Sequence, residues 1–252
     1  MSDPRVISLE KIKVACQNCS LASFCLPLGL KQGDVEKLDQ IVKRSRPIQR
    51  GEGLFHIGEH FQNIYAVKTG SFKTFIQTED GGEQVLGFHL PGELIGLDAI
   101  LDNIHGCSAK ALETSSICKI PFNQLEALST QLPSLQHQIF RLMSNEISKD
   151  TNMLMLLGNR SADERLATFL LSLSRRLAQR GFSATEFNLS MSRHDIASYL
   201  GLAVETVSRL FTRMQQDGLL KVDRKFVRLL DMEKLDALCE KNPHCHSKQL
   251  LP

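Results

Sequence analysis

Three cysteines lie close together near the start of the chain. Cys16, Cys19 and Cys25 form a C-x2-C-x5-C run. Thiolates at this spacing can bind one metal centre from a loop, because structural zinc ions and iron–sulfur cubes are both held by cysteine sulfur. Either centre usually has four protein ligands, so a fourth must come from elsewhere; the alternative is that the thiols are unligated. The candidates are the remaining cysteines: Cys107, Cys118, Cys239 and Cys245.

The composition is that of a globular protein in a reducing compartment. The chain has 252 residues, of which 42% are hydrophobic and 23% charged, and this length allows two domains. No apolar run approaches the roughly 18 residues of a membrane span, and the N-terminus lacks the apolar core of a signal peptide. We therefore expect a cytoplasmic protein that does not enter a membrane, with free or metal-bound cysteines rather than disulfides.

Short strands are predicted between residues 46 and 122. Glycines separate runs of β-forming residues at 64–67 and 72–76, and Asp80-Gly81-Gly82 is a hairpin signal. Because no helical pattern intervenes, an antiparallel barrel or roll is favoured, and the fold class is α+β.

The segment 133–157 reads as one long helix. Its a/d positions, spaced alternately by three and four, form the seam of a helix that packs on a parallel copy of itself. Asp150 is the one carboxylate on this line. It either points to water or pairs with a base, or it holds a homodimer close to dissociation through like-charge repulsion of roughly 1–4 kcal/mol. The predicted dimerisation residues are Phe140, Met143, Ile147, Asp150, Leu154 and Leu157.

A helix-turn-helix is the most specific local signal. After a capped helix from Ser161 to about Arg180, Ser192 caps a helix over 193–200, Gly201 allows a tight turn, and a second helix runs from 204 to about 217. The second helix of this motif enters the major groove of DNA, and a basic hairpin at 219–230 fits a wing. An αα-hairpin without function is the alternative.

The exposed positions of the second helix suit reading of a base pair. Arg209 can bond guanine, and Glu205, four residues earlier, can accept from cytosine; a solvated ion pair between them is the alternative. The predicted DNA-binding residues are Glu205, Thr206, Ser208, Arg209, Thr212 and Arg213.

The order of barrel, long helix and helix-turn-helix resembles the cAMP receptor protein superfamily, and the cysteines resemble the fumarate and nitrate reduction (FNR) regulators within it. The segments Gly87–Leu94, Leu142–Ile147 and Val204–Arg209 are also similar. The resemblance implies an N-terminal β-roll sensor of the cyclic-nucleotide-binding type, a dimerisation helix and a C-terminal winged helix-turn-helix. The expected boundaries are 1–30 for the cysteine-rich loop, 31–132 for the roll, 133–158 for the helix, 159–235 for the DNA-binding domain and 236–252 for a flexible tail.

The resemblance implies a [4Fe–4S] cluster held by Cys16, Cys19, Cys25 and Cys118, with Ser20 and Phe24 beside two of these ligands and able to tune access to it. Cyclic-nucleotide members hold the phosphate with an Arg-Ser pair, for which this chain has Cys107-Ser108. Without that guanidinium, cyclic nucleotide binding is not expected.

The resemblance also implies an oxygen-responsive function. With the cluster bound, the protein would dimerise on palindromes such as TTGAT-N4-ATCAA and activate or repress genes; O2 would convert the cluster and separate the dimer. The hairpin at 77–84 corresponds to a region that contacts RNA polymerase in the family. Its residues 78–83, which include Glu79 and Glu83, are expected to be exposed and acidic, and a plain solvated hairpin is the alternative. The alternative is a zinc-stabilised or cyclic-nucleotide-type regulator without oxygen sensing. An enzyme is disfavoured, because no nucleophile–base pair or phosphate-binding glycine loop stands out.

Overall fold

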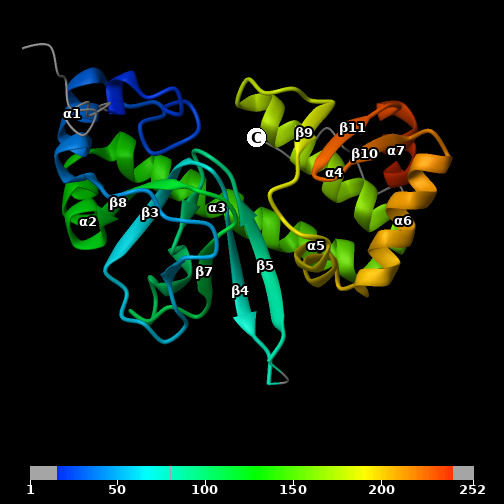
Figure 1. Ribbon diagram of the computed structural model, residues 1–252. Helices are drawn as coiled ribbons and strands as arrows, with labels where there is room; N and C mark the ends of the chain where they lie inside the picture. The colour runs from blue at the N-terminus through cyan, green and yellow to red at the C-terminus, as the bar shows by residue number, and fades with distance from the viewer. Residues whose placement is uncertain (1–15, 80, 241–252) are drawn as a thin grey trace, which may run out of the picture.

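Two antiparallel sheets form the N-terminal part of the computed structural model, which describes residues 16–79 and 81–240. One sheet has the order β1-β8-β3-β6 and the other β2-β7-β4-β5, so together they make the expected roll (Figure 1). The turn between β4 and β5 lies at the predicted hairpin. The strands are β1 (Lys43–Arg44), β2 (Gly53–Phe55), β3 (Asn63–Thr69), β4 (Phe72–Gln77), β5 (Glu83–His89), β6 (Leu94–Ile95), β7 (Ser108–Ala111) and β8 (Ser116–Pro121).

Helices close one end of the roll over an apolar cluster. The short 3-10 turn η2 (Cys16–Asn18) and the loop after it lie beside α1 (Gln32–Ile41), and α2 (Phe122–Gln131) follows β8. Leu26 of the loop, Leu38 of α1 and Leu125 of α2 are fully buried in this cluster. A second 3-10 turn, η3 (Leu97–Ala99), follows β6. The cysteine loop is therefore part of the roll's core rather than an appendage.

The long helix α3 (Pro133–Asn159) confirms the predicted element and continues through Gly158, where we expected it to end. Its first residue is a proline. Proline has no N–H, and an N–H at this position would find no partner within the helix, so nothing is lost. Phe140, Ile147 and Leu154 are 59%, 65% and 73% exposed, so three large apolar side chains of the predicted seam face outward. Exposed apolar stripes of this kind mark interaction surfaces.

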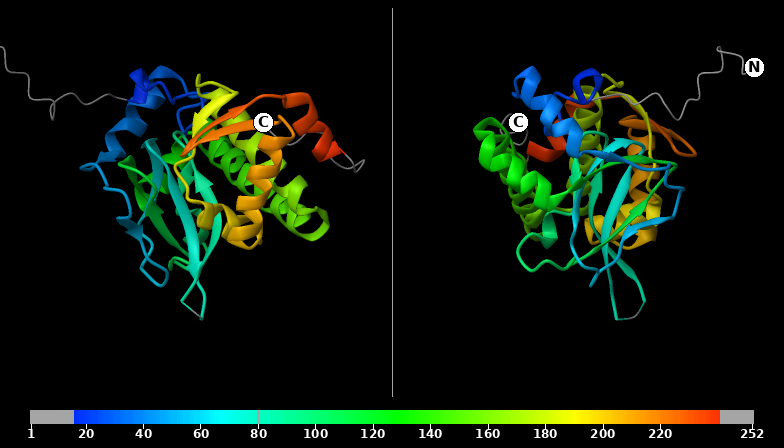
Figure 2. Two further views of the ribbon diagram at one scale, coloured as in Figure 1. Left: turned by 45° about the vertical axis from the view of Figure 1, so that its right-hand side comes forward. Right: turned by 90° about the vertical axis from the view of Figure 1, so that its left-hand side faces the viewer.

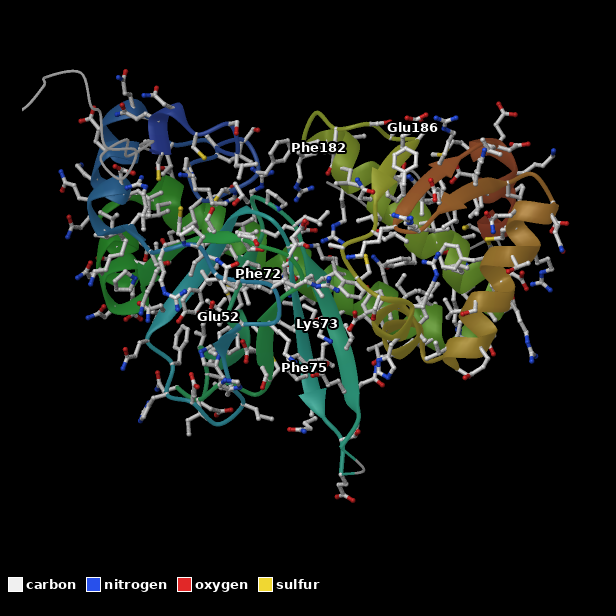
Figure 3. The ribbon with its side chains drawn as sticks, viewed as in Figure 1. Glu52, Phe72, Lys73, Phe75, Phe182 and Glu186 are labelled. Atoms are coloured by element: carbon white, nitrogen blue, oxygen red, sulfur yellow. The ribbon has the colours of Figure 1, made fainter. Side chains whose placement is uncertain are left out.

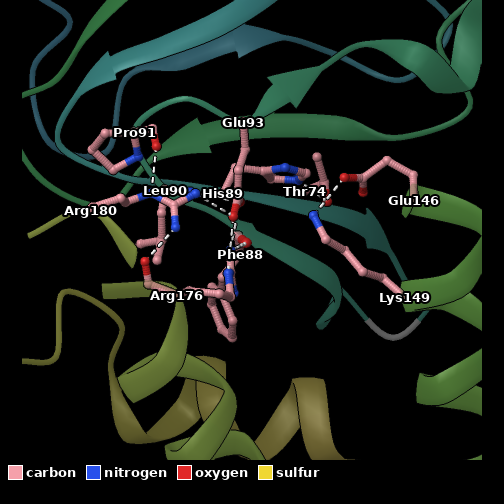
Figure 4. Close-up of polar contacts among 10 residues, drawn as sticks. All are labelled: Thr74, Phe88, His89, Leu90, Pro91, Glu93, Glu146, Lys149, Arg176 and Arg180. Carbon is pink, nitrogen blue, oxygen red and sulfur yellow. Dashed lines mark hydrogen bonds and ion pairs between the residues drawn. The ribbon is translucent and has the colours of Figure 1, made fainter. Parts of the chain in front are cut away.

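The neighbouring face of α3 is less exposed than its polar sequence suggests. Asn145, Lys149 and Asn152 are half-buried rather than in open water. Lys149 pairs with Glu146 at 2.6 Å, on the side of α3 that faces β5 and the following helix (Figure 4).

The C-terminal domain begins with α4 (Ala162–Gln179), which starts at the predicted capping box of Ser161 and Glu164. Gly181, at φ +80°, ends it: its N–H bonds Ala178 O and the N–H of Phe182 bonds Leu177 O. The helix-turn-helix and the wing are confirmed. The remaining elements are β9 (Glu186–Asn188), α5 (Arg193–Leu200), α6 (Val204–Gln216), β10 (Leu220–Asp223), β11 (Phe226–Leu229) and α7 (Met232–Glu240).

The chain remains helical past residue 236, where we expected a flexible tail. Cys239 is buried on α7, in the core shared with α4. Apolar spacing at Leu235 and Cys239 continues the domain's core pattern, and the boundary at 235 was wrong for that reason. Cys245 lies outside the described residues.

One apolar cluster spans both domains. Phe88 of β5 packs on Phe169 of α4 and Tyr199 of α5, with ring centroids 5.9 and 5.0 Å apart. Buried Lys73 of β4 (Figure 3) pairs with Asp195 of α5 at 2.5 Å. Ser198 of α5 accepts a bond from the N–H of Val85 and donates to Glu83 O. The first helix of the helix-turn-helix is thus seated on the β4–β5 hairpin.

A buried carboxylate makes the strongest connection between the domains (Figure 4). Glu93, between β5 and β6, accepts from Arg176 at 2.6 and 3.0 Å and from Arg180 at 2.8 Å. Burial alone would raise the pKa of Glu93, but the charges of Arg176 and Lys149 outweigh it and hold this pKa below its ordinary value of 4.5.

Among the described residues, no helix has both the length and the apolar character needed to cross a membrane.

Glu93→Gln is expected to lower the free energy of unfolding by about 3–5 kcal/mol, because two buried guanidinium groups would lose their countercharge. The difference from wild type should be largest above pH 4.5 and shrink as the pH falls below it, since the pKa of Glu93 is depressed in the folded state. Urea denaturation at several pH values measures this. Glu52→Gln, which removes an exposed pair with Arg46, is the control and should change stability little; an equal effect of both variants would contradict the prediction.

Candidate metal centre and DNA-recognition helix

The four cysteines predicted as ligands line one cavity of about 40 Å³: Cys16, Cys19, Cys25 and Cys118. Each is a free thiol and half-buried. They come from η2, the loop that follows it and β8, about a hundred residues along the chain from the first three. The structure therefore brings together the C-x2-C-x5-C run and one of the distant candidates.

Sheet register brings Cys118 to this place. Its strand β8 lies between β1 and β3, and Cys118 is paired with Arg44 on one side and Ala66 on the other. Asp39 of α1 fixes the other end of the site, because its carboxylate accepts from the N–H of Cys16 at 2.9 Å and from Arg44 at 2.5 Å. The loop also folds on itself, with Ala22 N–H bonded to Cys19 O and Leu28 N–H to Cys25 O.

Burial disfavours the thiolate form of Cys16, Cys25 and Cys118 in the metal-free protein. The pKa of Cys16 is raised to about 12, mainly by burial and further by a hydrogen bond to Asp39 and the negative charge of that residue. Burial also raises the pKa of Cys25 to about 12. Burial also raises the pKa of Cys118, although Arg44 and Lys68 oppose it. A bound metal centre must displace these protons, because the thiolate is the ligand.

The donor set fits a thiolate-bound cluster. Four soft sulfur ligands around one cavity suit zinc or an iron–sulfur centre. A zinc ion needs its sulfurs about 2.3 Å from a single point. Within residues 16–79 and 81–240, no three Cys, His, Asp or Glu side chains are placed to hold one metal ion together. A four-iron cluster takes one thiolate at each iron, so its four sulfurs need not meet at a single metal ion.

The other described cysteines do not line this cavity. Cys107 is buried in the roll, where its thiol donates to Asp98 at 3.5 Å. Cys239 of α7 is buried against α4. Ser20 and Phe24 are also outside the lining. The ring of Phe24 lies 5.6 Å from the guanidinium of Arg180. A role of Ser20 and Phe24 in access to the site stays a prediction.

The helix α6 presents its predicted residues on the outer face, while Val207, Leu210 and Phe211 are buried beneath it. Glu205 and Arg209 are exposed, and no ion pair joins them in the described part of the chain. Ser208 and Thr212 are exposed and donate to backbone carbonyls of their own helix.

Two of the predicted contacts differ from expectation. Thr206 is half-buried rather than exposed, because it faces the side of α6 that turns back towards the domain. Arg213 is exposed but pairs with Asp163 at the start of α4. On the wing, Arg224 occupies the turn with φ +55°, and Arg228 pairs with Glu186 of β9 at 2.7 Å.

Known proteins share this combination of domains. A family model described as the Crp-like helix-turn-helix domain matches residues 164–238, and one described as the cyclic nucleotide-binding domain matches residues 45–131. The chain is 54% identical to the transcriptional activator protein anr of Pseudomonas aeruginosa, over 88% of this chain and 91% of that one. This chain belongs to the CRP/FNR family of transcription regulators.

Other members agree in sequence and in fold. The fumarate and nitrate reduction regulatory protein of Escherichia coli is 47% identical over 92% of this chain and 91% of its own. The structure of FixK2 from Bradyrhizobium japonicum superimposes with a TM-score of 0.73 at 30% identity and covers 79% of this chain and 97% of that one. The predicted family, fold class and non-enzymatic role are confirmed: a CRP/FNR regulator binds DNA, and the family acts as dimers.

We expect Arg209→Ala to weaken binding to a TTGAT-N4-ATCAA duplex by about tenfold to a hundredfold, because a bidentate contact to guanine contributes about 1–3 kcal/mol. The variant should also lose its preference for that duplex over one with the G·C pair replaced by A·T. Fluorescence anisotropy titration measures both. Arg213→Ala, one turn further and already paired with Asp163, is the comparison and should keep the preference; discrimination retained by Arg209→Ala would contradict the assignment.

Proposed function

We propose that this protein is an oxygen-responsive transcription regulator that binds a [4Fe–4S] cluster through Cys16, Cys19, Cys25 and Cys118. The observation that carries the proposal is the convergence of four thiols on one cavity. The chain is also 47–54% identical to proteins named as fumarate and nitrate reduction regulators or as Anr activators. When bound, such a cluster supplies reactivity with O2. The protein would act in the cytoplasm, where its DNA target lies.

The contacts of the cysteine loop support a connection to the dimerisation helix. Gln138 of α3 is 3% exposed, and its side chain donates to Cys25 O at 3.2 Å. Leu135, one turn earlier, is fully buried in the same cluster as Leu26 of the loop. A change in the shape of the loop therefore acts directly on the first turns of α3.

The seam of α3 would form the homodimer that reads a palindrome. Asp150 lies on the line of Ile147 and Leu154 and borders a cavity of about 460 Å³ between α3, α4 and β5. Asp150 is exposed in one protomer, although partial burial and the nearby charge of Glu146 raise its pKa. A second copy would add like-charge repulsion, which packing of the apolar seam residues must outweigh.

RNA polymerase is the expected partner at promoters, with the β4–β5 hairpin as one contact. Our sequence interpretation treated Glu83 as an exposed acidic residue there, which is wrong. It is half-buried and pairs with Lys73 at 2.5 Å and Lys110 at 2.8 Å. Glu79 remains exposed at the tip, so the surface offered to a partner is smaller than the sequence suggested.

The two alternatives are less well supported. A zinc-stabilised regulator needs sulfurs that share one point, which the described side chains do not provide. A cyclic nucleotide would need a cation for its phosphate, but Cys107 faces Asp98 and Ser108 accepts from the N–H of Ile57. A carboxylate beside that pair repels an anion instead of binding it.

Protein purified without oxygen should show a broad visible absorption band that changes when air is admitted, and Cys118→Ala should lose it. Cys107→Ala is the matched control, because it removes a buried thiol that does not line the cavity, and it should keep the band. Iron, zinc and sulfide analysis accompanies the spectra. A colourless sample containing zinc, or a band that survives in Cys118→Ala, would contradict the assignment.

Asp150→Ala should strengthen dimerisation in air by about fivefold or more, because removal of the paired carboxylates relieves a repulsion of roughly 1 kcal/mol or larger. Analytical ultracentrifugation measures the association constant. Asp102→Ala removes the same charge from an exposed loop outside α3 and should leave the constant unchanged. Equal constants for wild type and Asp150→Ala would mean that the carboxylate does not oppose the dimer.

A further inference from the structure

The cysteine loop contacts the DNA-binding domain directly as well as through α3. Figures 1 and 2 show the loop beside the C-terminal end of α4. The residue that bridges them is Phe24, which precedes Cys25 and is half-buried. Its ring centroid lies 5.6 Å from the guanidinium carbon of Arg180, the residue that ends α4.

Arg180 is held rigidly in place for this contact. Its side chain is 4% exposed, and each of its nitrogens has a partner: Nε donates to Pro91 O at 2.5 Å, one terminal nitrogen to Arg176 O at 2.5 Å and the other to Glu93 at 2.8 Å (Figure 4). These bonds use three of the five N–H groups of the guanidinium and fix its position. Phe24 supplies an aromatic face within the range of a cation–π interaction.

Gly92 brings the loop close enough. At φ +91° it adopts a conformation that L residues rarely adopt, and a Cβ on it would lie 2.9 Å from Phe24 Cβ. Gly92 also lines the cysteine cavity. The cavity, Phe24 and the Glu93 network therefore meet at one turn of the β5–β6 connection.

We propose that Phe24 is a positioning residue that couples the cysteine loop to the DNA-binding domain by holding the flat face of Arg180. The proposal rests on the proposed function in one respect: the cluster would favour the closed loop, in which Phe24 already lies on Arg180 in this structure. A closed loop seats the ring on Arg180 and restrains the last turn of α4 against the roll. An open loop withdraws the ring and leaves that turn held by Glu93 and the backbone carbonyl bonds alone.

The coupling has consequences for the recognition helix, because α4 packs on α6 in the core of the DNA-binding domain. Buried Leu166 and Leu170 of α4 share that core with Val207 and Leu210 of α6. A less restrained last turn of α4 is therefore felt at α6 through this shared core. This connection does not pass through the α3 seam.

Hydrogen exchange of the full-length protein, with and without its cluster, tests the coupling. In wild type, loading should slow exchange both in the loop (residues 19–26) and in the last turn of α4 (176–182). In Phe24→Leu the loop should still be slowed, but exchange at 176–182 should be faster by about three- to tenfold. Phe24→Tyr keeps an aromatic face and should restore the wild-type pattern, which a role in packing volume alone would not predict.

Phe182→Leu is the matched control. It removes an aromatic ring two residues beyond Arg180, where Phe182 is 59% exposed (Figure 3), and should leave exchange in the loop unchanged. Arg180→Lys is the second single variant of a double-mutant cycle with Phe24→Leu. Because coupling is reciprocal, Arg180→Lys should speed exchange in the loop whether or not a cluster is present.

The outcomes separate this proposal from the proposed function. Protein without a visible band would overturn the cluster, yet reciprocal effects of Phe24→Leu and Arg180→Lys would still support the contact. The opposite result is a protein that carries the cluster but shows no coupling. In it, Phe24→Leu would leave exchange at 176–182 unchanged and Arg180→Lys would leave exchange in the loop unchanged. This result would overturn the coupling and leave the cluster assignment intact. Additive effects in the double variant would overturn it as well.

Discussion

The carboxylate of Glu93 lies between two arginines of the DNA-binding domain and is 9% exposed. Arg176 and Arg180 each also bond a backbone carbonyl of the roll, Phe88 O and Pro91 O. Charges taken out of water are stable only while they stay paired, so these groups cannot separate without a large cost. The angle between α4 and the roll follows from that constraint. The aromatic contacts of Phe88 with Phe169 and Tyr199 then fill the space beside it.

Much of the fold could be predicted because its signals are local. The capping residues Ser161 and Ser192 both make the expected bonds, and Gly201 adopts the left-handed conformation that the turn requires. The three- and four-residue spacing of α3 gave its length to within two residues. Family resemblance also pointed to Cys118 among the four candidates. From spacing alone it could not be chosen, because its place depends on the pairing of β8 with β1 and β3.

The errors concern residues whose partners are distant in the chain. Glu83 looked like a surface carboxylate, yet Lys73 and Lys110 on two other strands neutralise it. Arg213 pairs at the surface with Asp163 of α4, which the sequence did not indicate, and its contact with DNA stays a prediction. The segment after residue 235 looked like a tail, yet Cys239 completes the core against α4. A one-dimensional pattern shows that a side chain is charged or apolar, but not which element folds back to meet it.

The cysteine loop has two connections, and they control different quantities. The bond from Gln138 to Cys25 O reaches the start of α3, the helix that we propose forms the dimer. The contact of Phe24 with Arg180 reaches the end of α4, which shares its core with the recognition helix. Binding to a palindrome needs both conditions, because two recognition helices must lie one helical turn apart and at the angle of the groove. A loop that controlled association alone would leave the orientation of each recognition helix unspecified. Placing both contacts on adjacent residues, Phe24 and Cys25, makes one local change in the loop act on spacing and orientation together.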